Sequence, residues 1–253
     1  MYWQDKYVLK DCIEYEIKYA GNYGAKGEKR REKKKATPEV IKKQNQANRE
    51  KKMRRTLQLN FDKGDLWITL KYPKGTRKSV KEFERDIRNF QATMRRRYKS
   101  RGAIYKFVER HEVGAGGGLH LHLVIPKIPD VDMAKLVSEA WKHGRINLEP
   151  LDGNYGALAA YIVKEPTEAV EKQLSLFPIE DRGKLVRYST SRNLIRPEPE
   201  RKVYSRRTVR RMLLEGLKPS KGYYIDQDTV VTGINPYTGM SYIHYTERRV
   251  FDG

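Results

Sequence analysis

The stretch that decides the interpretation of this chain is Gly116-Gly117-Gly118-Leu119-His120-Leu121-His122-Leu123-Val124-Ile125-Pro126. From Leu119 to Ile125 two kinds of side chain alternate, and a period of two is typical of a β-strand. The alternation places His120 and His122 on one face of the strand and the leucines on the other. We therefore expect one face to pack in the core and the other to present two imidazoles.

The two imidazoles form a candidate metal site. Neutral imidazoles one strand-step apart can share a divalent cation when a third ligand, usually a carboxylate, comes from the neighbouring strand. A single cysteine, Cys12, excludes an intramolecular disulfide and a cysteine-rich zinc site. Ligands drawn from histidine and carboxylate favour Mn²⁺ or Mg²⁺ as the cofactor. The alternative is a solvated sheet face on which the pair binds nothing.

A tyrosine about forty residues further on, in Tyr161-Ile162-Val163-Lys164, adds a candidate nucleophile. Asn154 is expected to cap a helix here and Pro166 to end it. Residues i and i+3 share a helix face, so the phenol of Tyr161 and the ammonium of Lys164 are expected together. A tyrosine that attacks a phosphate needs a metal to polarise it and a cation to balance the developing charge.

A His-hydrophobic-His strand followed by Tyr-x-x-Lys resembles the HUH endonucleases, specifically the single-tyrosine rolling-circle replication initiators (Rep proteins) of plasmids, phages and related mobile elements. The resemblance covers roughly residues 57–197. It implies metal-dependent nicking and joining of single-stranded DNA at an origin, through a 5′-phosphotyrosine intermediate that leaves a 3′-hydroxyl primer. It assigns Tyr161 and Lys164 as catalytic residues and His120 and His122 as metal ligands.

The third metal ligand also follows from the resemblance. The strand before the metal motif in this family commonly reads apolar-x-apolar-apolar-Glu, and residues 105–109, Tyr-Lys-Phe-Val-Glu, have that form. Glu109 is therefore expected to complete the site. Glu112 and His111 are the alternatives: Glu112 lies at a more usual distance from His120 but off the strand pattern. The register of the hairpin decides between them.

The charge of the chain points to a polyanionic partner. The net charge is +21, with 53 Lys and Arg against 32 Asp and Glu. Nucleic acid is the first expectation and an anionic membrane surface the second. No apolar run approaches a membrane span and the first residues lack a signal-peptide plan, so we expect a cytoplasmic protein in a bacterial host cell. No Walker-type sequence is present, so a host helicase and a host DNA polymerase are expected partners. The oligomeric state is not encoded in any of these patterns.

The order of expected elements predicts an α+β fold, a central antiparallel sheet with helices packed on it. Alternation predicts strands at 13–19, 57–61, 66–72, 104–109, 119–125 and 145–150. Helical spacing and caps predict helices at 37–53, 80–98, 130–144, 154–165 and 208–217. The expected domains are a basic N-terminal extension with a strand, a flexible arm and a polar helix (1–54), the endonuclease domain (55–197) and a basic C-terminal extension (198–253).

Two rival functions are compatible with these patterns. A transposase or conjugative relaxase would use the same site and the same chemistry. A non-catalytic, basic nucleic-acid-binding protein would carry His120 and His122 incidentally, and its activity would depend on neither metal nor Tyr161.

Overall fold

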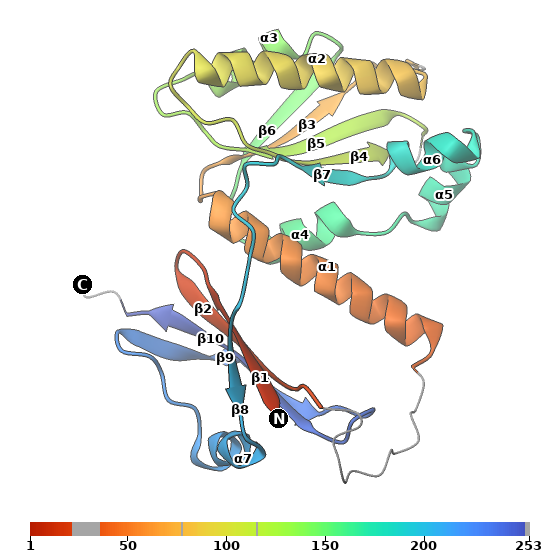
Figure 1. Cartoon of the computed structure of the whole chain (residues 1–253). Coiled ribbons are helices and arrows are strands. Elements are labelled where there is room, and N and C mark those ends of the chain that lie inside the picture. The colour runs from red at the N-terminus through yellow and green to blue at the C-terminus, as the bar shows by residue number, and fades with distance from the viewer. Residues whose placement is uncertain (22–35, 77, 115, 251–253) are drawn as a thin grey trace. The chain divides into compact units, whose positions relative to one another are not determined.

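The computed structural model describes residues 1–21, 36–76, 78–114 and 116–250 (Figure 1). Contacts within the chain divide it into two compact units, residues 46–195 and residues 1–45 together with 196–253. Each unit contains a five-stranded antiparallel sheet, which confirms the α+β class. The predicted basic arm, with Arg30, Arg31 and Lys33 to Lys35, lies outside the described residues. Within the described ranges no helix has the length and apolar character needed to cross a bilayer.

The unit of residues 46–195 is built on a sheet with the strand order β6-β3-β5-β4-β7. Its strands are β3 (Leu66–Lys71), β4 (Val108–Val113), β5 (Leu119–Ile125), β6 (Arg145–Pro150) and β7 (Tyr188–Thr190). Its helices are α1 (Pro38–Asn60), which begins in the other unit, α2 (Val80–Lys99), α3 (Met133–Ala140), α4 (Tyr155–Val163), α5 (Glu168–Leu174) and α6 (Ile179–Leu185).

Helices cover both faces of this sheet (Figure 1). Helix α2 begins at a capping box, in which Ser79 and Glu82 exchange hydrogen bonds. Its apolar stripe, together with α3, packs on the face that carries the leucines of β5. The opposite face is covered at one end by α1 and α4, through Met53, Leu57 and Ile162 against Val108 and Val124. The histidines of β5 belong to this second face, beyond the part that the two helices cover.

Helix α1 corrects a strand prediction. Residues 57–61 were expected to form a strand, but the helix continues to Asn60. Met53, Leu57 and Phe61 recur every four residues and all are buried against the sheet, so a helical period accounts for the apolar residues. Alternation over only five residues fits both periods, and here the helical face finds the larger core.

The strand before the histidine strand is also displaced from its expected place. Residues 104–109 were predicted as a strand, whereas β4 begins at Val108 and continues to Val113. Ile104 is 72% exposed. The shift matters for the site, because it moves Glu112 into the sheet and pairs it with β5.

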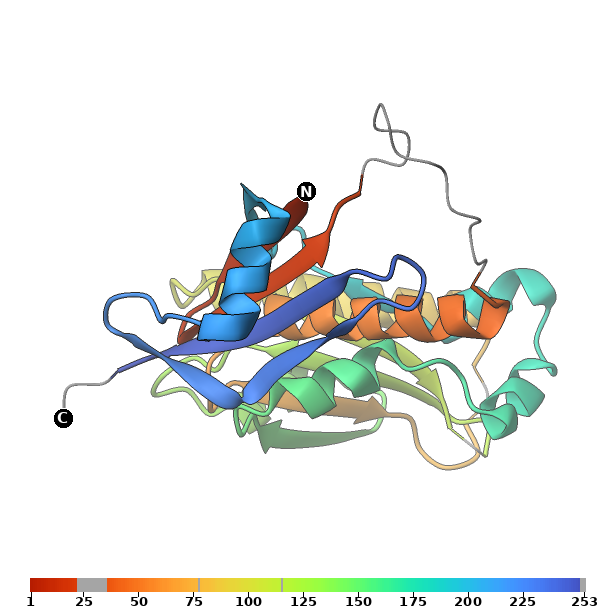
Figure 2. The same ribbon diagram turned by 90° about the horizontal axis from the view of Figure 1, so that it is seen from below.

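The second unit joins the two ends of the chain in one sheet with the order β8-β1-β2-β10-β9. Its strands are β1 (Tyr2–Val8), β2 (Cys12–Tyr19), β8 (Glu200–Tyr204), β9 (Tyr223–Ile234) and β10 (Ser241–Arg249). Helix α7 (Arg206–Glu215) lies on one face of this sheet (Figures 1 and 2), where Val209 is buried with Tyr15, Ile17 and Ile243. The segments predicted as separate N-terminal and C-terminal extensions therefore pair with each other.

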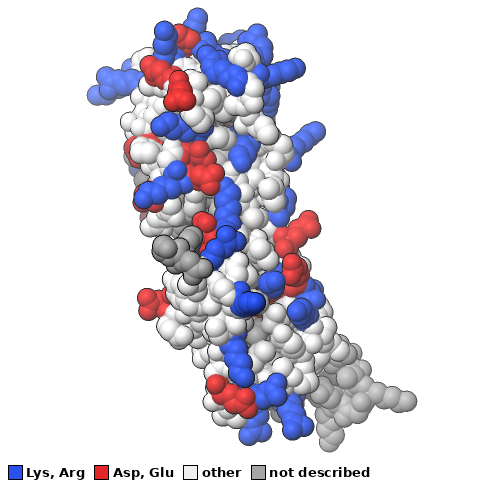
Figure 3. Space-filling view, turned by 90° about the vertical axis from the view of Figure 1, so that its left-hand side faces the viewer, with Lys and Arg blue, Asp and Glu red and all other residues white. Residues whose placement is uncertain are grey.

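The surface reflects the composition. On the face shown in Figure 3, Lys and Arg side chains are widely spread and Asp and Glu side chains are fewer, as the net charge of +21 requires. Such a surface attracts polyanions at long range but does not by itself distinguish among them.

Candidate active site

Strand pairing determines which side chains share the face of the two histidines. His122 lies opposite Arg110 of β4 and Thr69 of β3. His120 lies opposite Glu112 of β4 and Lys71 of β3. Partners in register point to the same face of a sheet, so these residues form two adjacent rows across it.

Helix α4 places Tyr161 and Lys164 against these rows. Asn154 caps the helix, as predicted, by accepting a hydrogen bond from the backbone N–H of Ala157. The Tyr161 hydroxyl donates to Glu112 Oε2 at 2.5 Å and lies 3.3 Å from His122 Nε2. Lys164 Nζ lies 2.8 Å from Glu112 Oε1 and 3.9 Å from the centre of the Tyr161 ring.

The structure thus brings His122, Tyr161 and Lys164, all singled out from the sequence, into one cluster around Glu112. His122 Nε2 lies 3.0 Å from Glu112 Oε2. His120 is the neighbour of this cluster, with its ring centre 6.3 Å from that of His122.

Glu109, the expected third ligand, is not brought to this face. It pairs with Leu123 and so lies on the opposite face of the sheet, toward α2. There its carboxylate accepts hydrogen bonds from Gln91 Nε2 at 2.7 Å and Ser189 Oγ at 2.6 Å. His111, the other alternative, is buried on that same face with Nδ1 2.9 Å from the carbonyl oxygen of Lys184. Of the three candidates, Glu112 alone lies beside the histidines.

The electrostatics keep the Glu112 carboxylate ionised. Burial alone raises its pKa, but hydrogen bonds with His122, Lys164 and Tyr161 outweigh burial and hold the pKa well below its usual range. Burial and the anionic Glu112 together raise the pKa of the Tyr161 phenol. Burial, reinforced by the positive charge of Lys71, lowers the pKa of His120. At neutral pH the site therefore holds a carboxylate, a protonated phenol and a neutral His120.

The orientation of His122 is set by two residues of β3. Its Nδ1 lies 3.1 Å from the Thr69 hydroxyl, which leaves Nε2 directed toward Tyr161 and Glu112. Trp67 stacks on the imidazole with ring centres 5.2 Å apart and an interplanar angle of 8°, and meets the Tyr161 ring edge-on. Trp67, expected to be a core residue, thus packs against the apolar cluster beneath α1 and α4 and also forms a wall of the site.

Arg110 is a site residue that the sequence patterns did not single out. It is buried, and its Nη1 donates to the carbonyl oxygens of Ile162 and Lys164, at 2.5 and 3.0 Å. These carbonyl groups belong to the C-terminal end of α4, where helix carbonyls lack partners within the helix. Arg110 therefore fixes the end of the helix that carries Tyr161 and Lys164. An arginine in a strand gives no such signal until the strand is paired, so only its position two residues before Glu112 could have suggested a role.

The chemistry of the donors fits a divalent cation. Glu112 is ionised, His120 stays neutral, and the Nε2 atom of His122 points into the cluster. In the conformation described, however, no three His, Cys, Asp or Glu side chains of the described residues are close enough together to hold a metal ion. The Glu112 oxygens instead contact Lys164 and Tyr161. Metal binding would require His120 and Glu112 to converge with His122.

Comparison with known proteins gives one match. Residues 65–166 match a family model that describes replication-associated proteins of the ORF2 type. No curated protein sequence matches the chain. The matched segment covers less than half of the chain, but it extends from the residue before β3 to just beyond α4 and so contains both histidines, Glu112, Tyr161 and Lys164. The segment that carries the candidate site is therefore similar to replication-associated proteins, which is consistent with a rolling-circle replication initiator.

Proposed function

We propose that this protein initiates rolling-circle replication by nicking and joining single-stranded DNA at an origin. The observation that carries the proposal is the placement of the Tyr161 hydroxyl against His122 and Glu112, on the sheet face that also holds His120. The similarity of residues 65–166 to replication-associated proteins supports it. The net charge of +21 supports a nucleic-acid substrate.

Tyr161 is the proposed nucleophile. Its phenolic oxygen attacks the scissile phosphorus, a Tyr161 O–P bond forms, and the bond from phosphorus to the 3′ oxygen breaks. The products are a 5′-phosphotyrosyl link and a free 3′-hydroxyl, which takes up the proton that the phenol gives away. Glu112 Oε2 and His122 Nε2, at 2.5 and 3.3 Å from the hydroxyl, are the groups within reach to receive that proton first.

Lys164 is proposed to bind the phosphate. It lies 2.8 Å from Glu112 and above the Tyr161 ring, and its side chain is 37% exposed, so an incoming anionic strand can reach it. A fixed ammonium beside the reacting phosphorus stabilises the charge that develops there. The hydrogen bonds from Arg110 to the end of α4 keep Lys164 and Tyr161 at this place.

Mn²⁺ or Mg²⁺ is the proposed cofactor. His120, His122 and Glu112 would hold it, and when bound it would supply Lewis-acid polarisation of the scissile phosphate. The assignment replaces Glu109 by Glu112, because strand pairing places Glu109 on the opposite face. His122 is already oriented by Thr69, which is the kind of support that ligating histidines require.

The reaction products determine the partners. A free 3′-hydroxyl is the substrate of a DNA polymerase, and the chain has no Walker-type sequence, so a host polymerase and helicase are proposed to complete replication. With one nucleophilic tyrosine, termination requires the reverse attack by a 3′-hydroxyl or the tyrosine of a second subunit.

The test is a nicking assay on end-labelled single-stranded oligonucleotides that carry the candidate origin, with Mn²⁺ or with EDTA. We expect the wild type to form a covalent adduct with Mn²⁺ alone, and Tyr161→Phe to form none. Tyr155→Phe is the matched control, because Tyr155 lies on the same helix but its hydroxyl bonds to the carbonyl oxygen of Phe61. An adduct in the Tyr161→Phe protein would assign another nucleophile. Tight binding without cleavage by any of the proteins would favour a non-catalytic nucleic-acid-binding protein.

A further inference from the structure

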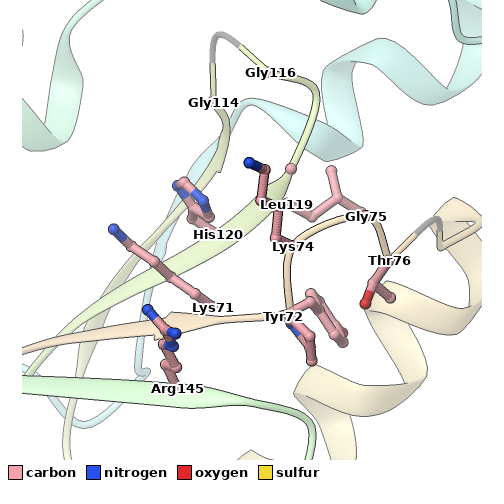
Figure 4. A pocket seen from close by; sticks show the side chains of 12 residues that line it. Lys71, Tyr72, Lys74, Gly75, Thr76, Gly114, Gly116, Leu119, His120 and Arg145 are labelled. Atoms are coloured by element: carbon pink, nitrogen blue, oxygen red, sulfur yellow. The ribbon is translucent and has the colours of Figure 1, made fainter.

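A basic pocket opens beside His120, on the side of the sheet away from Tyr161. Its volume is about 740 Å³. Figure 4 shows the side chains of His120, Lys71 and Arg145 one after another along one side of it. The pocket is lined by these three residues and by Tyr72, Pro73, Lys74, Gly75, Thr76, Gly114, Gly116, Gly118 and Leu119.

The register of the sheet makes this arrangement continuous with the candidate active site. Glu112, His120, Lys71 and Arg145 are direct cross-strand partners on four neighbouring strands, β4, β5, β3 and β6. Neighbouring strands lie about 5 Å apart, so Lys71 and Arg145 follow His120 at steps of about 5 and 10 Å. Tyr161 and Lys164 contact the opposite end of this row, at Glu112.

The cations of the pocket lack acidic partners. Lys71 and Arg145 are exposed, and within the described ranges neither they nor Lys74 form an ion pair or side-chain hydrogen bond. Lys164, at the other end of the row, does have such a partner in Glu112. Like charges on directly opposed strand positions destabilise a sheet unless an anion lies between them. Lys71 and Arg145 are therefore expected to be compensated by an external anion.

A close backbone contact fixes the spacing of the two cations. Gly144, the residue before Arg145, has a φ of +150°, and a Cβ there would lie 2.3 Å from the carbonyl oxygen of Lys71. Only glycine permits this approach of the backbone. The pocket also has an aromatic wall, Tyr72, whose hydroxyl donates to Asp86 at 2.9 Å and so holds the ring in place. Aromatic rings beside a basic groove are typical of sites for single-stranded nucleic acid.

We propose that Lys71, Arg145 and Lys74 bind consecutive phosphates of the single-stranded substrate, next to the phosphate that reacts at Tyr161. The inference rests on the proposed function for the identity of the strand. The DNA strand would pass from Tyr161 across the histidines and over β3 and β6, and Tyr72 would contact a sugar or base on the way. The pocket then acts as a positioning site, which holds the strand in register for attack.

The test measures binding of a short fluorescent oligo(dT) by anisotropy as a function of salt, in EDTA and in a Tyr161→Phe background. The measurement therefore requires neither the nucleophile nor a metal. We expect Lys71→Gln/Arg145→Gln to weaken binding about ten-fold at physiological salt. The slope of log K against log salt should fall by roughly 0.7 for each lost contact, or about 1.4 in total. Lys74→Gln, on an exposed loop, should lower the slope by about 0.7.

The matched control is Lys81→Gln/Lys135→Gln, which removes the same charge from exposed positions outside the pocket. It should bind as the parent protein does. Equal losses in the pocket and control variants would reduce the effect to net charge and overturn the proposal, as would an unchanged slope in the pocket variant. Lys71→Arg/Arg145→Lys should restore binding, which would show that loss of charge, and not of folding, is measured.

The failure of this proposal and that of the proposed function give different results. If the protein cleaves the origin strand but the pocket variant keeps its salt slope, the pocket is excluded and nicking stands. If no protein cleaves DNA while the pocket variant loses its slope, the strand-binding site stands without the reaction. Where both hold, the pocket variant should raise the KM for nicking and leave kcat nearly unchanged.

Discussion

Glu112 is the residue on which the candidate site converges, since His122, Tyr161 and Lys164 all contact its carboxylate. We expect Glu112→Gln to reduce nicking by more than the roughly 10–100-fold that outer-shell partners of a metal site cost. The amide keeps the size of the side chain but removes the charge that a cation would bind. Adduct formation and Mn²⁺ titration by calorimetry measure the two effects.

Glu109→Gln is the matched comparison, because the same change is made three residues away on the other face of β4. Its carboxylate accepts buried hydrogen bonds from Gln91 and Ser189, so we expect a loss of stability of about 1–3 kcal/mol without loss of Mn²⁺ affinity. Thermal unfolding measures the first. A Glu109→Gln protein that no longer binds Mn²⁺ while Glu112→Gln binds it normally would restore Glu109 as the ligand.

At this scale the sequence predicts residue types better than residue partners. His120, His122, Tyr161 and Lys164 stand out because alternation along a strand and spacing along a helix are local properties. The choice between Glu109 and Glu112 depends on where β4 begins and on how it pairs with β5, and neither is local. Arg110 was missed for the same reason, since its role depends on the carbonyl groups of a helix 52 residues away.

Helix α1 gives a prediction at the scale of one element. If residues 57–60 are helical, Leu57 and Leu59 differ in burial, whereas a strand would place both on one face. Leu57 is fully buried and Leu59 is only partly so. We expect Leu57→Ala to lower the free energy of unfolding by about 2–5 kcal/mol and Leu59→Ala to lower it by clearly less. Urea denaturation followed by circular dichroism measures both, and equal losses would support the strand.

Elements with strong terminal signals were predicted closely. Ser79 and Glu82 marked the start of α2, and Asn154 marked the start of α4. Residues 57–61 and 104–109 have no such signal, and there a short alternation was the only guide. The first segment is helical because four-residue spacing reaches a buried core. At the second, the strand lies further on, where every residue from Val108 to His111 is buried.

Asp5 gives a prediction at the scale of the whole molecule, because it connects strands from both ends of the chain. Its buried carboxylate on β1 lies 2.6 Å from Arg201 of β8 and 2.9 Å from Lys18 of β2. Burial raises its pKa, but the hydrogen bonds and charges of Arg201 and Lys18 outweigh burial, so the pKa is lowered. A lowered pKa stabilises the folded state above the unfolded pKa of about 4, and this stabilisation is lost as the pH falls through the folded pKa.

We therefore expect Asp5→Asn to destabilise the protein by roughly 1–3 kcal/mol at neutral pH. The difference from the wild type should shrink as the pH falls below about 4, where the wild-type carboxylate also becomes neutral. Unfolding curves measured between neutral and acidic pH test this. A difference that stays constant with pH would mean that the aspartate contributes through its shape alone. Lys6→Gln is the control, since its ion pair with Glu200 is exposed.

The arrangement of whole segments was the least accessible from the sequence. The N-terminal and C-terminal regions were expected to be separate extensions, but β1 pairs with β8 and β2 pairs with β10. Pairing between residues as distant as Tyr2 and Tyr204 leaves no periodic trace in either segment. The class of fold followed from the local patterns, while the second sheet followed from contacts that no window of sequence contains.

The pairing of β1 with β8 and of β2 with β10 also has a consequence for the order in which the protein is made. During synthesis β1 and β2 leave the ribosome first, but β8, β9 and β10, which complete their sheet, leave last. Until then the hairpin has two open edges that any exposed strand could join. Residues 46–195 lie between and form a unit of their own, so they have time to fold first. A ribosome that stops before Glu200 would release a chain in which the unit with the candidate site is complete and the N-terminal hairpin is unpaired at both edges, which is a substrate for proteases and for aggregation.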